Sequence, residues 1–294
     1  MRYRKLKIII SLFFWILMRL KRFVLHCFGK KEAGKCVAVY YHSVLDHEKK
    51  EFKKQMHYLV QLAEPLQAGA KMDLKAEKNY VIITFDDGFQ SFLRNALPVL
   101  QDLKIPCAVF FPTLFIGMSP DWEEWNIFKE TNEVIMTEEQ IKSLPKDLIT
   151  IGSHSHSHPA FFNSSDWDVD LEFCKSKEIL KSICATEVTL FSFPYGQLNE
   201  KLAELAFEAG YSRLFTIDHS VIDSVLDKNI MGRVFIDPSD SKLEFKLKIS
   251  GAYKWMQLAS FFKKITKSFF ESLFPMKKMK LQENLNFDEE SKDN

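Results

Sequence analysis

The sequence has few cysteines and no pair of them at the CxxC spacing of redox motifs and zinc ribbons. Five cysteines, an odd number, are spread over 294 residues. We therefore expect no disulfide framework, which favours a reducing compartment. The sequence also lacks an excess of either charge: its net charge is +1, and no nucleic-acid-binding motif is present. A nucleic-acid partner is therefore not expected.

A long apolar run is missing from the N-terminal region as well. The run from Ile8 to Met18 has eleven residues, which as a helix span roughly 16 Å, against roughly 30 Å for a hydrocarbon core. No small-x-small cleavage motif follows it. Residues 1–35 contain ten Lys or Arg and one acid, Glu32, a balance of +9. We predict that this segment lies on an anionic membrane surface at the cytoplasmic face, as a peripheral interfacial helix. A short signal anchor with an outward-facing domain is the alternative.

The other end of the chain, residues 251–294, has a related pattern. Tyr253 to Lys280 carries seven lysines against Glu271, a balance of +6. Apolar residues recur there at helical spacing, namely Trp255, Leu258, Ala259, Phe262, Ile265, Phe269 and Leu273. We predict a basic amphipathic helix that lies on a membrane surface or packs on the preceding domain, followed by a disordered acidic tail.

Residues 36–250 have the alternating pattern of a folded α/β domain. Seven short apolar runs predict strands at 36–42, 80–87, 107–111, 148–153, 189–193, 214–217 and 231–236. Helices are predicted between them, among them one over 89–100 that Pro98 interrupts late and two that begin at the caps Thr137 and Asn199. Alternating strands and helices of this kind indicate parallel βα units.

Two adjacent carboxylates stand at the end of one predicted strand. The apolar run Tyr80-Val81-Ile82-Ile83 leads into Thr84-Phe85-Asp86-Asp87-Gly88. Adjacent carboxylates at the end of a buried strand cost free energy unless a cation or a proton offsets them. A helix cap followed by a turn aspartate would explain the same residues without any site.

Histidines after a later strand favour a site. His154 and His158 are four residues apart in Gly152-Ser153-His154-Ser155-His156-Ser157-His158-Pro159. Two histidines and one carboxylate form a ligand set that leaves coordination positions open for water and substrate. Such a set suits Zn²⁺, with Co²⁺, Ni²⁺, Fe²⁺ or Mn²⁺ as further possibilities.

These motifs, together with Phe193-Pro194-Tyr195-Gly196 after a fifth strand, resemble the polysaccharide deacetylases, carbohydrate esterase family 4, also called the NodB-homology domain. The resemblance covers roughly Val37 to Phe235. It implies an incomplete (β/α)7-type barrel, here with basic amphipathic helical extensions at both ends. It also implies a metal-dependent hydrolase that removes N-acetyl groups from an amino sugar in a glycan or a lipid-linked glycan.

The resemblance assigns roles to residues at matching positions. Asp87, His154 and His158 are the implied metal ligands, and Asp86 is the implied general base. The backbone N–H of Tyr195 is implied as a donor to the oxyanion, and the turn Phe193-Pro194-Tyr195-Gly196 is implied to bind substrate.

The sequence departs from the family at two places. Ser192 stands near the position where many members have an arginine poised on the base, and no histidine follows His219 to supply the usual acid. We predict that Arg233 replaces the arginine within hydrogen-bond reach of Asp86, and that His42 lines the same cavity as the acid, with His219 as the alternative. A deformylase or amidase acting on a lipid-linked amino sugar, and a non-catalytic glycan-binding protein with a relic site, are the other functions these residues allow.

Overall fold

The computed structural model describes residues 2–122, 132–162, 168–218, 221–223, 229–257 and 259. By its contacts the chain divides into one compact unit, Met1–Trp255, and a second unit, Met256–Asn294. Most of the predicted C-terminal helix and the whole acidic tail lie outside the described residues. The domain boundaries predicted at 35/36 and 250/251 stay predictions.

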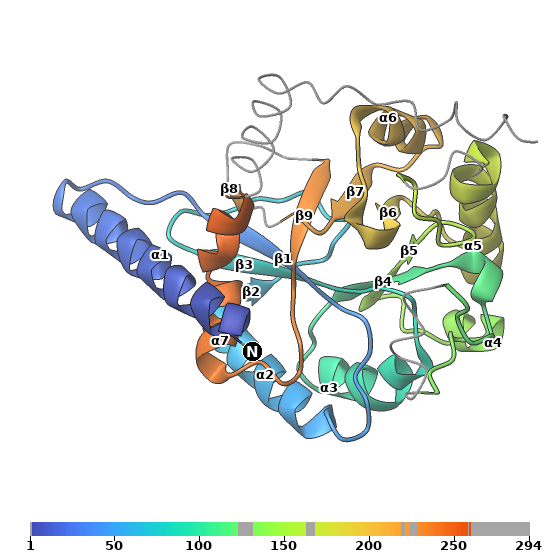
Figure 1. The fold of residues 1–294 in the computed structure, drawn as a ribbon, viewed down its shortest axis with the longest axis horizontal. Helices are drawn as coiled ribbons and strands as arrows, with labels where there is room; N and C mark the ends of the chain where they lie inside the picture. Colours follow the sequence, from blue (N-terminus) through green and yellow to red (C-terminus); the bar gives the residue numbers. More distant parts are fainter. Residues whose placement is uncertain are drawn as a thin grey trace, which may run out of the picture. The chain divides into compact units, whose positions relative to one another are not determined.

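Seven parallel strands form a closed ring, so the predicted barrel is confirmed (Figure 1). β1 pairs with β3 on one side and with β9 on the other, which closes the order β1-β3-β4-β5-β6-β7-β9. The ring strands are β1 (Lys35–Tyr41), β3 (Asn79–Phe85), β4 (Cys107–Phe111), β5 (Ile149–Ser153), β6 (Leu190–Ser192), β7 (Arg213–Thr216) and β9 (Ile230–Phe235).

Two further strands pair with ring strands over residues that have no ring partner on that side. β2 (Glu64–Pro65) pairs in parallel with the first half of β3, and β8 (Val221–Asp223) pairs antiparallel with the first half of β1. The helices of the described chain are α1 (Arg2–Cys27), α2 (Lys49–Leu62), α3 (Leu97–Asp102), α4 (Glu138–Lys142), α5 (Ser176–Cys184), α6 (Glu200–Glu208) and α7 (Lys242–Ile249). Short 3₁₀ or π-helical segments are Phe92–Ala96, Thr113–Phe115, Asp170–Lys175, Pro194–Gly196 and Ala252–Lys254.

Every second side chain along the strands points into the barrel, and these side chains fill its interior. Alternate residues of β3 (Tyr80, Ile82) pack with alternate residues of β4 (Ala108, Phe110) and with Met231 of β9 in one buried cluster. The same alternation carries polar side chains into the barrel at the carboxyl ends of the strands. Thr84 and Asp86 continue the row of Tyr80 and Ile82, and Arg233 continues the row of Met231.

The helix predicted over 89–100 differs from the structure. A π-helical turn, Phe92–Ala96, precedes α3, and Pro98 lies in the first turn of α3 rather than at a late interruption. The first helical turn tolerates proline, because a backbone N–H at that position would have no intrahelical partner and its loss costs nothing. The predicted caps are confirmed: Thr137 forms a capping box with Gln140, and Asn199 accepts from the N–H of Leu202.

The N-terminal helix α1 is longer than the apolar run that indicated it, because the basic residues on both sides of the run are helical too. One face of α1 packs on α7 and on the segment Ala252–Lys254. Ser11, which is fully buried, accepts a 2.8 Å hydrogen bond from Nε1 of Trp255. Within the part of the chain that the structure describes, no helix is both long and apolar enough to cross a membrane.

A buried charge cluster fixes the first turn of α1. Arg4 donates to Asp240 and to Glu244, each at 2.8 Å, and Lys248 donates to Asp240 at 2.6 Å. The two carboxylate side chains are at most 5% exposed, whereas that of Arg4 is 46% exposed. Two buried anions are thus balanced by Lys248 and Arg4.

We expect Arg4→Ala to lower the free energy of unfolding by about 1–2 kcal/mol. The variant leaves two buried carboxylates facing one cation, and the cost stays below the roughly 3–5 kcal/mol of a fully buried pair because Arg4 is half exposed. Urea unfolding of the variant measures the change, with Lys5→Ala, an exposed neighbour on α1, as the control. Equal stability of Arg4→Ala and Lys5→Ala would contradict the contact.

Candidate active site

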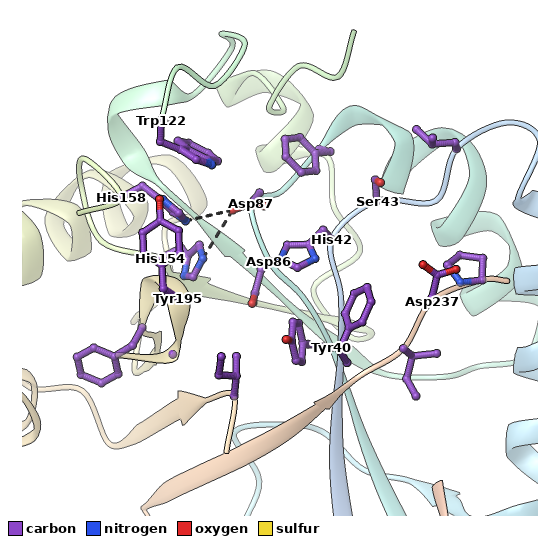
Figure 2. Close-up of a pocket in the computed structure, with 18 of the residues that line it drawn as sticks. Tyr40, His42, Ser43, Asp86, Asp87, Trp122, His154, His158, Tyr195 and Asp237 are labelled. Atoms are coloured by element: carbon purple, nitrogen blue, oxygen red, sulfur yellow. Dashed lines mark ion pairs between the residues drawn. The ribbon is translucent and has the colours of Figure 1, made fainter. Parts of the chain in front are cut away.

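Most of the site residues predicted from the sequence line one pocket at the carboxyl ends of the barrel strands. The pocket has a volume of about 480 Å³. Its walls come from the carboxyl ends of the seven ring strands and the segments that follow them, which is where parallel barrels place their chemistry. Figure 2 shows the aspartate pair in the middle of these side chains, with His154 and His158 on one side of it and His42 on the other.

The three predicted metal ligands form one buried cluster. Oδ1 of Asp87 lies 3.6 Å from Nε2 of His154 and 3.7 Å from Nε2 of His158 (Figure 2). One ligand atom from each of the three residues falls within 4.8 Å of the others. These separations are too long for hydrogen bonds and fit three donors around a common ion.

The charge states of the three residues also favour a metal ion. Oδ1 of Asp87 is buried and has no hydrogen-bond partner among the described residues. Burial, followed by the charge of Asp86, raises the pKa of Asp87 well above its ordinary value. Burial also lowers the pKa of His154 to about 4 and that of His158 well below its ordinary value. An unpaired carboxylate oxygen facing two neutral imidazoles is the donor set of a divalent cation, so the residues present fit a metal ion.

Outer contacts orient both histidines. Nδ1 of His154 lies 2.7 Å from the backbone oxygen of Ser192, which can only accept. Nδ1 therefore carries the proton, and Nε2 is left to face Asp87. The ring of His158 stacks on Trp122, with centroids 4.0 Å apart. Trp122 belongs to a stretch that the sequence pattern marks only as a loop, so its role was not predicted.

The loop between the two histidines is bound by Glu172, a residue that the sequence pattern did not indicate. Glu172 is 3% exposed and accepts hydrogen bonds from the backbone N–H of His156 and of Ser157. The ring of His156 bonds to the hydroxyl of Thr113 at 2.8 Å and takes no part in the ligand cluster.

Left-handed backbone conformations gather at the site. Asp87 (φ 66°), Ser155 (φ 68°), His158 (φ 56°) and Tyr195 (φ 57°) all have positive φ. Each such residue costs of order 1–3 kcal/mol and persists only where the surroundings enforce it. Gly88, next to Asp87, also has positive φ, and a Cβ there would collide with the ring of Phe111. The turn that presents Asp87 therefore requires glycine at 88.

The predicted contact between Arg233 and Asp86 is confirmed. Nη1 of Arg233 donates to Oδ1 of Asp86 at 2.7 Å, and Nη2 donates to Oδ2 at 2.8 Å. Arg233 is fully buried inside the barrel, and its other N–H groups donate to Thr84, Ser192 and the backbone oxygen of Thr216. All five donors of the guanidinium are thereby used.

This pairing keeps Asp86 ionised. Burial alone would raise the pKa of Asp86, but the charge of Arg233 overcomes it and lowers that pKa to about 2. Asp86 and Asp87 are thus adjacent in sequence, but their pKa values are shifted in opposite directions, because only Asp86 is hydrogen-bonded to the arginine. Ser192 connects the Asp86–Arg233 pair to His154: its hydroxyl donates to Asp86 and accepts from Arg233, and its backbone oxygen bonds to the ring of His154.

The remaining predicted residues are placed as follows. His42, Phe193, Tyr195 and Gly196 line the pocket, so the predicted position of His42 is confirmed. Pro194 is buried beneath the turn and is not among the pocket-lining residues. His219, the alternative acid, lies outside the described residues.

Comparisons with known proteins agree with the motifs. A sequence model of the polysaccharide deacetylase family matches residues 73–214. YxkH of Bacillus subtilis (strain 168), which carries the name of a polysaccharide deacetylase, is 26% identical over 234 residues, which cover 76% of this chain and 77% of that protein. The poly-beta-1,6-N-acetyl-D-glucosamine N-deacetylase of Escherichia coli (strain K12) is 26% identical over 222 residues, 65% of this chain and 32% of that protein. The match therefore spans about a third of the E. coli protein.

The fold has close counterparts among solved structures. The structure of IcaB from Ammonifex degensii superposes with a TM-score of 0.61 at 23% sequence identity, covering 76% of this chain and 98% of that chain. At this sequence identity the structural similarity supports the fold alone, and the assignment to a family rests on the motifs and the family match. Together they confirm the family that the sequence indicated: this chain belongs to the polysaccharide deacetylases.

Proposed function

We propose that this protein is a metal-dependent hydrolase that removes N-acetyl groups from an amino sugar within a glycan, with Zn²⁺ as the ion best suited to its ligands. The observation that carries the proposal is the unpaired Oδ1 of Asp87, which faces two imidazole nitrogens beside an ionised Asp86. The name of the E. coli relative supports N-acetylglucosamine as the sugar.

The contacts of these residues support the proposed roles. Asp87, His154 and His158 would hold a divalent ion, whose Lewis acidity would lower the pKa of a water toward about 7 and polarise a carbonyl. Asp86, kept ionised by Arg233, accepts a proton from the attacking water. The backbone N–H of Tyr195, in its left-handed turn, is the proposed donor to the developing oxyanion.

The chain must also deliver a proton to the departing amine. His42 is the proposed acid, because it lines the pocket across the aspartate pair from the ligand histidines (Figure 2). Its ring contacts Tyr40 and Phe235 at centroid distances of 5.5 and 5.7 Å, and it is open to the solvent of the pocket. Tyr40, Phe235, Trp122 and Tyr195 give the pocket an aromatic lining on which the apolar face of a sugar ring can rest.

Product analysis tests the proposal against its alternatives. The purified protein is supplied with Zn²⁺ and incubated with oligomers of β-1,6-linked N-acetylglucosamine and, separately, with an N-formylated amino sugar on a lipid carrier. We expect acetate from the first substrate. Formate from the second without acetate from the first would favour the deformylase. Tight glycan binding with neither product would favour the non-catalytic protein.

Arg233→Lys tests how the base is held. We expect turnover to fall about 10- to 100-fold, because a lysine cannot reproduce the two-pronged contact, and one charge-assisted hydrogen bond contributes about 1.5–3 kcal/mol. Asp86 must be ionised to act, and a weaker partner raises its pKa, so the acidic limb of the rate profile should move to higher pH. Unchanged metal content and circular dichroism are the controls. An unmoved limb with full turnover would show that Arg233 is not needed by the base.

A further inference from the structure

Helix α1 has two apolar faces, and only one of them packs on the barrel. The inner face carries Ser11 and the half-buried Trp15 and Met18, and it packs on α7 and the Ala252–Lys254 segment. The opposite face carries an apolar stripe formed by Leu6, Ile9, Phe13, Leu17, Leu20 and Phe23. These six side chains are between 46% and 67% exposed and recur every three or four residues. We call them the outer stripe.

An exposed stripe of this length calls for a covering partner. Soluble proteins rarely leave contiguous apolar patches of more than a few hundred Å² in water, and larger ones mark sites of interaction with proteins or membranes. The stripe extends over much of a 26-residue helix. Its position opposite the packed face means that the barrel itself does not cover it.

The charges around the stripe indicate the partner. Lys5, Lys7, Arg19 and Lys21 are exposed on α1, and the first acid of the chain is Glu32. Long basic side chains beside an apolar stripe can keep their charges at the level of lipid headgroups while their stems lie on the acyl boundary. A second copy of this chain is a poor occupant, because pairing two stripes would bring like charges together.

We propose that α1 docks this protein onto an anionic lipid surface, with the outer stripe inserted at the boundary between headgroups and acyl chains. The apolar area and the positive charge act together: the stripe supplies burial, and the lysines and arginines supply attraction to anionic headgroups. The docking does not depend on the proposed reaction.

Contacts at the two ends of α1 determine the orientation that the barrel would have on the lipid surface. At one end Arg4 is bonded to Asp240, three residues beyond Asp237, which lines the pocket. At the other end Arg22 donates to the backbone oxygen of Glu77 at 3.1 Å, just before β3 begins. The helix therefore runs along the side of the barrel, from its catalytic end to its opposite end (Figure 1). A docked barrel lies on its side, and its pocket opens beside the lipid surface rather than away from it.

Vesicle co-sedimentation of the full chain tests the proposal. The probes are vesicles of phosphatidylcholine alone and vesicles of phosphatidylcholine with phosphatidylglycerol. We expect binding to the anionic vesicles that weakens as salt rises from about 0.1 to about 1 M, which shortens the screening length from about 10 to about 3 Å. The double variant Phe13→Glu, Leu17→Glu should bind about tenfold more weakly or worse, because two apolar anchors become anions.

A matched control separates the stripe from a general effect of added negative charge. The double variant Val60→Glu, Leu171→Glu changes two helical residues that are 41% and 45% exposed and lie off α1. It should bind anionic vesicles as the wild type does. Equal weakening by both double variants would overturn the role of the stripe.

Two other results would also overturn the proposal. Wild-type protein that sediments as a dimer without lipid, and turns monomeric in Phe13→Glu, Leu17→Glu, would show that a second copy covers the stripe. Monomeric wild-type protein that does not bind anionic vesicles would show that the stripe does not dock on lipid. The side of the membrane, cytoplasmic or outward, stays a prediction from the sequence that protease treatment of spheroplasts decides.

Discussion

The His158→Ala variant should lose its divalent ion and its hydrolase activity together. His158 supplies one of three donors to the proposed ion, and its Nε2 lies 3.7 Å from Oδ1 of Asp87. Removing an outer partner of a ligand typically costs about 10–100-fold in metal affinity, and removing a ligand should cost more. Metal content after dialysis and acetate release, measured on one preparation, check both losses.

His156→Ala is the matched control for this change. It removes an imidazole two residues away on the same loop, whose ring bonds to Thr113 rather than facing Asp87. We expect it to keep the ion and most of the activity. Equal loss in both variants would mean that the loop, rather than the His158 nitrogen, is what matters.

The Asp86→Asn variant should keep the ion but lose turnover about 10²–10⁴-fold, the usual effect of removing a general base. An amide cannot accept the proton of the attacking water. The structure adds a second consequence: Arg233, fully buried, would lose its counterion. Leaving a buried charge unpaired costs about 3–5 kcal/mol, so the melting temperature should fall as well.

Ser192→Ala separates these two effects. It removes a 2.7 Å hydrogen bond to Arg233 but keeps the carboxylate of Asp86. We expect a small loss of stability and a far smaller loss of turnover than for Asp86→Asn. If folded, metal-loaded Asp86→Asn turns over at a near-normal rate, Asp86 is not the base.

The period-2 pattern explains why much of the site could be predicted. Asp86 follows Tyr80, Ile82 and Thr84, the inward-facing residues of β3, so the alternation predicts that its side chain points into the barrel. Arg233 lies on β9, two residues beyond the inward-facing Met231. In the sheet, β9 is adjacent to β1. A lone arginine amid apolar residues of a buried strand requires a buried anion, and Asp86 is that anion.

Other features depend on contacts that no local pattern encodes. β8 is only three residues long and runs antiparallel to β1, so it has neither the length nor the alternation of a predictable strand. Trp122 becomes part of the site because its ring stacks on His158, and Pro194 does not line the pocket because the turn buries it. The burial of one face of α1 depends on Asp240, Glu244 and Trp255, more than 200 residues away in the sequence.

X-ray diffraction at the zinc absorption edge, from crystals grown with Zn²⁺, shows whether the pocket holds a metal ion without requiring knowledge of the substrate. We expect one strong anomalous peak in the pocket, about 2.0–2.2 Å from Oδ1 of Asp87 and from Nε2 of His154 and His158. A pocket without an anomalous peak, or a peak held by other residues while these three donors face away from it, would show that they are not the metal ligands.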